Sequence, residues 1–118
     1  MGYVRVRAKA WNVEEPSRYR GVELPADTGA VYMALPTNLL KELDLKPIGK
    51  RRFRLTNNQV TERDIGIVGI EVQGVKAHTV VVFGDENVYL LGVVTLEELG
   101  PEVDPVNGEL RPTELLLM

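Results

Sequence analysis

Residues 22–35 read VELPADTGAVYMAL, and this stretch decides how the rest of the chain is interpreted. Apolar side chains at 22, 24 and 26 alternate with other residues, which predicts a strand with one buried face leading into Asp27-Thr28-Gly29. The apolar run 31–35 predicts a second strand directly after Ala30. Alone, the tripeptide is typical of a turn. Between two strands, it becomes a candidate for a carboxylate held at a fixed point of a sheet.

Short strands account for most of the remaining sequence. Alternation predicts an opening strand at 4–10, whereas 12–21 has few apolar residues and predicts a loop. Segments 50–55 and 60–67 predict a hairpin, because the intervening Thr56-Asn57-Asn58-Gln59 contains residues that accept positive φ.

The second half of the chain continues the same pattern. Gly66 and Gly69 predict a bulge in a strand at 65–72, and a further strand is expected at 77–83. Two short helices are expected at 37–44 and 94–99 from their start and stop signals. We therefore expect a mostly β fold with a closed or barrel-like sheet and two short helices, as one domain over residues 1–118.

Composition excludes several kinds of chemistry. The 118 residues are 44% hydrophobic, which is enough for a core without metals or disulfides. There is no cysteine, so disulfides, zinc–thiolate sites and thiol nucleophiles are excluded. One histidine, His78, and one serine, Ser17, leave no two-imidazole metal site and one possible pair for a serine triad. Carboxylates remain as the acid–base groups.

Charge and hydropathy also limit the partners. The net charge of −3 argues against nucleic acid as the main partner, because phosphate binding needs a basic surface. No apolar run approaches the roughly 20 residues of a membrane-spanning helix, and residues 1–7 alternate rather than forming a signal peptide. We expect a cytoplasmic protein that does not bind membranes.

The sequence resembles the retropepsin-like aspartic proteases, the single-domain group (clan AA) that includes retroviral proteases and prokaryotic relatives. The resemblance runs from about residue 3 to residue 113 and rests on motif order and spacing. The matching segments are Asp27-Thr28-Gly29-Ala30, the hairpin at 54–60, Leu90-Leu91-Gly92, and the segments 96–100 and 103–106. It implies a closed retropepsin-like β-barrel and a homodimeric aspartic endopeptidase that acts on peptides or proteins without a cofactor or metal.

The resemblance also assigns a role to each matched segment. Asp27 would be catalytic and face its copy from a second subunit, and Thr28 would hydrogen-bond across the dimer axis. Gly29 and Ala30 would support the active-site loop. The flap that closes over a peptide would consist of Leu55, Thr56, Asn57, Asn58 and Gln59. Leu90, Leu91 and Gly92 would pack beneath the catalytic loop.

Paired carboxylates suit peptide hydrolysis. Two of them about 3 Å apart cannot both ionise cheaply, so they share a proton. The ionised member takes a proton from the attacking water, while its protonated partner donates to the carbonyl oxygen and later to the leaving amine. A chain with one such aspartate reaches this geometry only by pairing with a second copy.

Two departures from the family pattern stand out. Pro25-Ala26 precedes Asp27 where relatives carry a β-branched or aliphatic residue, and proline removes a backbone donor from the strand. The flap tip has Asn57-Asn58 where many relatives have glycine.

Other interpretations stay open. The chain could be a non-catalytic peptide-binding or dimerisation module with the same fold. The basic segment 50–54 could bind nucleic acid, although a solvated hairpin face is favoured. The apolar tail Leu115–Met118 could enter a dimer interface, or fold onto its own core or fray.

Overall fold

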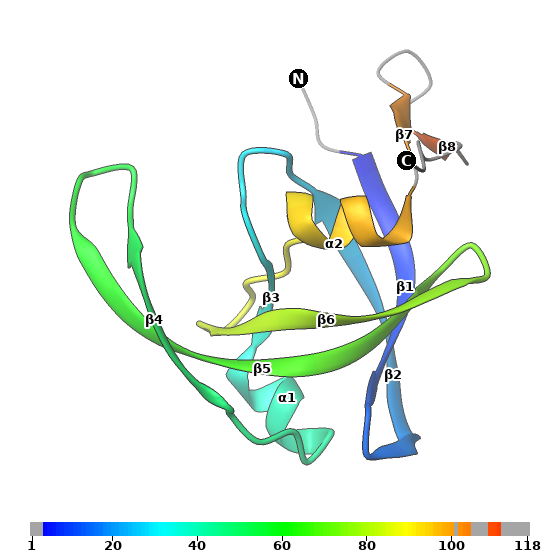
Figure 1. Ribbon diagram of the computed structural model, residues 1–118, viewed down its shortest axis with the longest axis horizontal. Helices are drawn as coiled ribbons and strands as arrows, with labels where there is room; N and C mark the ends of the chain where they lie inside the picture. The colour runs from blue at the N-terminus through cyan, green and yellow to red at the C-terminus, as the bar shows by residue number, and fades with distance from the viewer. Residues whose placement is uncertain (1–3, 101, 105–108, 112–118) are drawn as a thin grey trace, which may run out of the picture.

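The computed structural model describes residues 4–100, 102–104 and 109–111, with side chains described for 4–100 (Figure 1). Most of these residues lie in strands. In chain order the elements are β1 (Val4–Asn12), β2 (Glu15–Ala26), β3 (Met33–Pro36), α1 (Thr37–Glu42), β4 (Gly49–Arg54), β5 (Val60–Val72), β6 (Val75–Gly84), α2 (Val93–Leu99), β7 (Glu102–Asp104) and β8 (Glu109–Arg111). The mostly β fold with two short helices is confirmed.

The main sheet has the order β2-β1-β5-β6-β3, and β4 pairs with β5. The long strand β5 crosses the middle of the molecule, where its first half pairs with β4 and its last residues pair with β1 (Figure 1). β3 runs parallel to β6, and the other pairs are antiparallel. β7 and β8 form a separate two-stranded sheet.

The ladders of the described strands do not close into a barrel, which corrects the expectation of a closed sheet. Among the residues described, the edge strands β2 and β3 are joined only through the segment at 90–91, by single bridges from Ala26 to Leu91 and from Ala34 to Leu90. A short irregular segment therefore stands where a closed barrel would need a paired strand.

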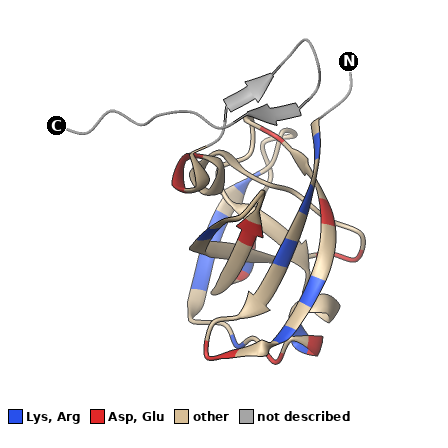
Figure 2. Ribbon diagram, turned by 90° about the vertical axis from the view of Figure 1, so that its right-hand side faces the viewer, with Lys and Arg blue, Asp and Glu red and all other residues tan. Residues whose placement is uncertain are grey.

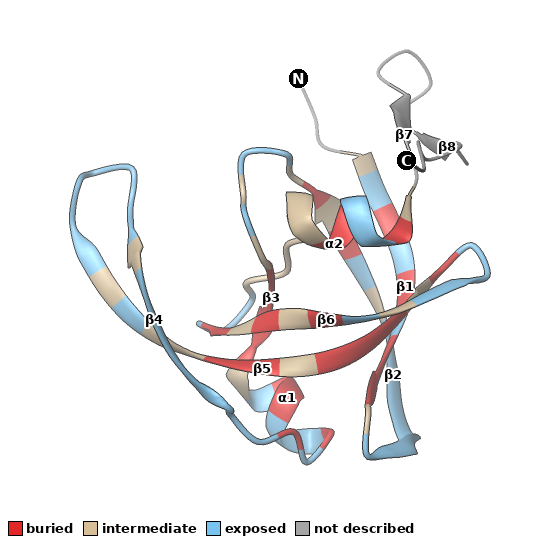
Figure 3. Cartoon of the chain, viewed as in Figure 1, coloured by how far each residue is buried: buried red, intermediate tan, exposed pale blue. Residues whose placement is uncertain are grey.

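The core lies between the curved sheet and the two helices, and Figure 3 shows the buried segments gathered there. In β1 the predicted alternation holds, because Val6, Ala8 and Ala10 are buried while the basic residues between them are exposed. The largest fully buried apolar side chains are Leu24, Met33, Leu35, Leu40, Ile70, Leu91, Val68 and Val81.

The predicted loop at 12–21 was wrong, because residues 15–21 belong to β2. They pair with β1 in an antiparallel register that includes Trp11 opposite Tyr19. All seven are exposed, so this half of β2 carries no apolar alternation for a sequence reading to detect. Backbone pairing and contacts such as Lys9 Nζ over the Tyr19 ring, 4.4 Å from its centroid, hold it in place.

The predicted bulge at 65–72 was also wrong. The register of β5 with β6 runs without a break from Ile65 opposite Val82 to Val72 opposite Val75. Gly69 instead makes room for the Trp11 indole, since a Cβ there would lie 2.1 Å from a ring carbon.

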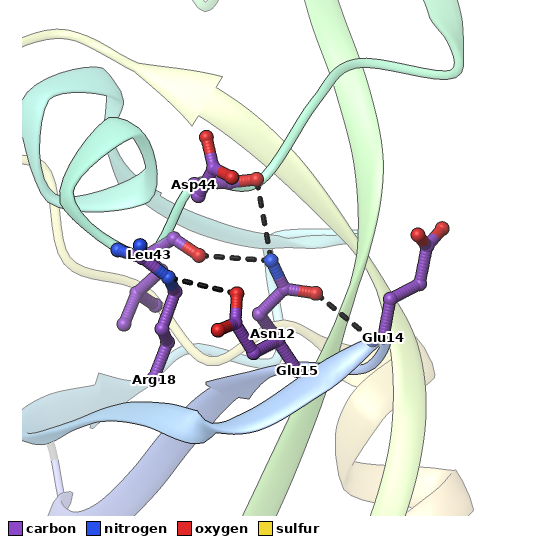
Figure 4. Close-up of polar contacts among 6 residues, drawn as sticks. All are labelled: Asn12, Glu14, Glu15, Arg18, Leu43 and Asp44. Carbon is purple, nitrogen blue, oxygen red and sulfur yellow. Dashed lines mark hydrogen bonds and ion pairs between the residues drawn. The ribbon is translucent and has the colours of Figure 1, made fainter.

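Asn12 ties the β1–β2 turn to the segment after α1 (Figure 4). Its side-chain amide donates to the carbonyl oxygens of Leu43 and Asp44, at 2.9 and 3.2 Å, and its oxygen accepts from the Glu14 N–H at 2.9 Å. Asn12 is only 9% exposed, so these bonds satisfy an otherwise buried polar group. The tail Leu115–Met118 lies outside the described residues.

Candidate active site

Asp27 directly follows the last residue of β2 and is anchored by its backbone. Its N–H donates to the Leu91 carbonyl oxygen at 3.0 Å, and the Leu91 N–H donates to the Pro25 carbonyl oxygen at 2.9 Å. Pro25 thus contributes an acceptor at the end of an edge strand, where its missing donor is tolerated. The start of the Asp27 loop is fixed against the segment at 90–92.

The Asp27 carboxylate is oriented by its own loop. The Gly29 N–H donates to Asp27 Oδ1 at 2.8 Å, and the Ala30 N–H donates to the Asp27 carbonyl oxygen at 3.1 Å. A Cβ at Gly29 would lie 3.1 Å from Oδ1, so glycine suits this position. Asp27 is half-buried, whereas Thr28 and Gly29 are exposed. In the part of the chain that the structure describes, no cation forms an ion pair with this carboxylate.

The Leu90-Leu91-Gly92 segment and α2 support the rest of the loop. Leu90 and Ala34 exchange two backbone hydrogen bonds of 3.0 Å, and Leu91 is fully buried. At the start of α2, the N–H groups of Val93 and Val94 donate to the carbonyl oxygens of residues 30 and 31, at 2.8 and 3.0 Å. The structure therefore brings this segment against both sides of the Asp27 loop.

The predicted flap residues form the tip of the β4–β5 hairpin. Leu55 donates to the Gln59 carbonyl oxygen at 2.7 Å and accepts from the Asn58 N–H at 2.9 Å. Asn58 has φ of 72°, the left-handed conformation that closes a three-residue hairpin loop. The Asn57 side chain accepts from the Gln59 N–H at 3.0 Å. The Asn57-Asn58 departure at the tip is thus compatible with a tight turn.

Tyr32 links the hairpin to the Asp27 loop, and the sequence reading missed it. The Tyr32 ring lies edge-on to Phe53, with centroids 6.3 Å apart and planes at 84°. Arg51 Nη1 donates to the Tyr32 hydroxyl at 3.3 Å, and the guanidinium carbon lies 5.8 Å from the ring centroid. The sequence signal was the i, i+2 spacing of Arg51 and Phe53, which puts them on one face of a strand. Nothing in the sequence identified their partner.

The basic segment 50–54 is partly compensated. Lys50 Nζ lies 3.6 Å from an Asp64 oxygen and 4.0 Å from a Glu62 oxygen. Elsewhere, both basic and acidic bands occur on the strands that face the viewer in Figure 2. This mixture favours a solvated hairpin face over a phosphate-binding surface.

A cavity of about 600 Å³ lies away from the predicted site. It is lined by the β1–β2 turn, residues 44–48 and Ile67, and it contains none of the predicted site residues.

Within the described residues, no group of three or more His, Asp or Glu side chains could hold a metal ion. None of the helices described is long and apolar enough to cross a membrane.

Comparison with known proteins gives a structural match only. No protein-family model matches the chain, and the search of curated proteins found no match. The solution structure of the simian foamy virus (mac) protease aligns with a TM-score of 0.58 and 19% identity, over 80% of this chain and 93% of that one. The foamy viral protease–reverse transcriptase, solved with an RNA/DNA hybrid, aligns with a TM-score of 0.60 and 16% identity, over 98% of this chain and 13% of that one. These matches show a retropepsin-like fold.

Proposed function

We propose that this chain, which has a retropepsin-like fold, is an aspartic endopeptidase that works as a homodimer and forms one domain over residues 1–118. The observation that carries the proposal is the setting of Asp27. Its carboxylate is held by the Gly29 N–H on an exposed loop whose backbone is anchored at 91 and 93. A carboxylate in fixed geometry without a cationic partner among the described residues is available for chemistry.

Pairing supplies the second carboxylate. A two-fold axis beside Thr28 would bring Asp27 of each subunit together, and the exposed position of Thr28 and Gly29 leaves room for this. The two carboxylates would share one proton, because both cannot ionise at close range. Each chain contributes half of the site.

The reaction needs no group beyond these two and a water. The ionised carboxylate accepts a proton from the water as its oxygen bonds to the scissile carbonyl carbon. The protonated carboxylate donates to the carbonyl oxygen, which becomes a hydroxyl. When the C–N bond breaks, a proton passes to the leaving amine and the pair returns to its starting state. The hairpin tip at 55–59 would cover the bound peptide.

A peptide library at mildly acidic pH tests the proposal. We expect cleavage by the wild type and none by Asp27→Asn. Asp44→Asn is the matched control, because Asp44 is an exposed aspartate with φ of 58° that asparagine also adopts. Cleavage that survives Asp27→Asn would contradict the proposal. Absence of cleavage by a folded wild-type dimer that still binds peptides would favour the non-catalytic binding module.

Mixing the two proteins tests the shared site. If each active site needs Asp27 from both subunits, replacing wild-type subunits by Asp27→Asn subunits at constant total protein and allowing exchange lowers the activity as the square of the wild-type fraction. A linear fall would show that each chain acts alone.

A further inference from the structure

The two faces of the β4–β5 hairpin differ in how their charges are compensated. Cross-strand partners share a face, so Lys50 with Asp64 and Arg52 with Glu62 lie on one side. The third base on this outer face, Arg54, is opposite Val60 and donates to the Asn58 carbonyl oxygen at 3.2 Å. Two of the three bases on the outer face therefore have an acid as their cross-strand partner.

The other face carries an arginine pair. Arg51 lies directly opposite Arg63, and like charges in this position destabilise a sheet. Arg63 is neutralised by Asp85, which accepts two hydrogen bonds at 2.7 and 3.0 Å. Among the described residues, no carboxylate pairs with Arg51. A chain with net charge −3 thus keeps one uncompensated guanidinium on this face.

Arg51 also lies beside the loop that carries Asp27. Its two described contacts are both with Tyr32, through the hydroxyl at 3.3 Å and through the ring face. Tyr32 follows Asp27 by five positions, and the backbone just before it is held by the 3.0 Å bond from Val94. Phe53 packs on the same ring, so this inner face of the hairpin turns toward the Asp27 loop.

We propose that Arg51 and the Tyr32 hydroxyl bind a carboxylate of the peptide substrate, so that the protein selects peptides with Asp or Glu close to the scissile bond. A guanidinium has five N–H donors and one is used here, which leaves an edge for bidentate contact with a carboxylate. The Tyr32 hydroxyl accepts from Arg51 and keeps its own hydrogen to donate. The inference deepens the proposed function and rests on the binding of a peptide beside Asp27.

Binding to the Asp27→Asn protein separates this inference from catalysis. Fluorescent peptides that differ only by Glu, Gln or Lys at one position are titrated against it. We expect the Glu peptide to bind about tenfold to a hundredfold more tightly than the Gln peptide, as expected for hydrogen bonds to a charged group. Arg51→Gln should remove this difference, and Arg51→Glu should favour the Lys peptide. Arg52→Gln, the same change on the outer face, should keep it.

Each outcome decides the matter. A Glu preference in a protein whose wild type cleaves nothing would support the inference and contradict the peptidase proposal. Cleavage without any Glu preference, no measurable peptide binding, or a preference unchanged by Arg51→Gln would overturn the inference. So would loss of the dimer in Arg51→Gln on sedimentation, because Arg51 would then be an interface residue. Peptides ending in a free acid or an amide distinguish a side-chain carboxylate from a terminal one.

Discussion

Gly92 lies so close to Tyr32 that a Cβ atom on Gly92 would stand 2.6 Å from the Tyr32 carbonyl oxygen. The φ and ψ of Gly92, −84° and 176°, suit any residue, so space rather than conformation requires glycine here. The contact joins the start of α2 to the loop that follows Asp27. The position of that loop therefore requires a residue without a side chain at position 92.

Gly92→Ala should destabilise the protein and disturb the Asp27 loop. The clash is with backbone, which cannot rotate away, so we expect a loss of about 1–3 kcal/mol in the free energy of unfolding, measured with urea. Peptide cleavage should fall as well. Gly21→Ala is the control, because a Cβ at Gly21 meets nothing within 4 Å. Equal stability of the two variants would show that α2 and the loop adjust freely.

Gly69→Ala should move the only tryptophan of the chain. A Cβ at Gly69 would lie 2.1 to 2.7 Å from three indole atoms of Trp11, which is 9% exposed. We expect a shift in Trp11 fluorescence together with a loss of about 1–3 kcal/mol in unfolding free energy. Gly49→Ala, where a Cβ meets nothing within 4 Å, should leave both unchanged. An unchanged emission spectrum for Gly69→Ala would mean that the indole is not held against β5.

The sequence predicted the elements that bury one apolar face. β1, the second half of β2 and both helices carry their pattern in the side chains, and so does the asparagine turn at the hairpin tip. An exposed strand is harder to predict from sequence. Residues 15–21 are held by backbone pairing, which needs no apolar pattern. Glycines that make room for a distant ring look the same in sequence as glycines in a bulge.

The candidate site likewise contains residues that local motifs predicted and residues that only long-range contacts bring together. Asp27 and the Leu90-Leu91-Gly92 segment were found through local motifs, and the structure brings them into contact. Tyr32 and Arg51 were missed as a pair because 19 positions separate them and their contact depends on where the fold places β4 relative to the Asp27 loop. The open edge between β2 and β3 is likewise a property of long-range pairing.

Replacing Asn12 should loosen the β1–β2 turn. Asn12→Asp keeps the oxygen that accepts from Glu14 and loses the donor to the carbonyl oxygens of Leu43 and Asp44. An ionised carboxylate would then face two carbonyl oxygens in a buried position, so we expect a loss of about 1–3 kcal/mol or more in unfolding free energy. Glu14→Ala is the control, because only the backbone of Glu14 takes part. If the Asn12→Asp protein unfolds at the same urea concentration as the wild type, the side-chain amide of Asn12 contributes nothing to stability.

The two buried threonines that join α2 to β6 should behave as a coupled pair. Thr79 Oγ1 donates to Glu98 Oε1 at 2.6 Å and lies 2.8 Å from Thr95 Oγ1. A hydroxyl has one hydrogen. Because the Thr79 hydroxyl donates its hydrogen to Glu98, the Thr95 hydroxyl must be the donor to Thr79. Thr79→Val removes the acceptor for Thr95, whereas Thr95→Val leaves Thr79 bound to Glu98.

We therefore expect Thr79→Val to cost more than Thr95→Val, about 1–3 kcal/mol against about 1 kcal/mol of unfolding free energy. Thr95 is 0% exposed, so its hydroxyl has no water to replace the lost acceptor in Thr79→Val. The double variant removes that orphaned hydroxyl and should cost less than the sum of the single variants, by 0.5 kcal/mol or more on the order expected for side chains in contact. Urea unfolding of the four proteins measures the coupling. Strictly additive costs would mean that the hydrogen bond between the two threonines does not hold α2 against β6.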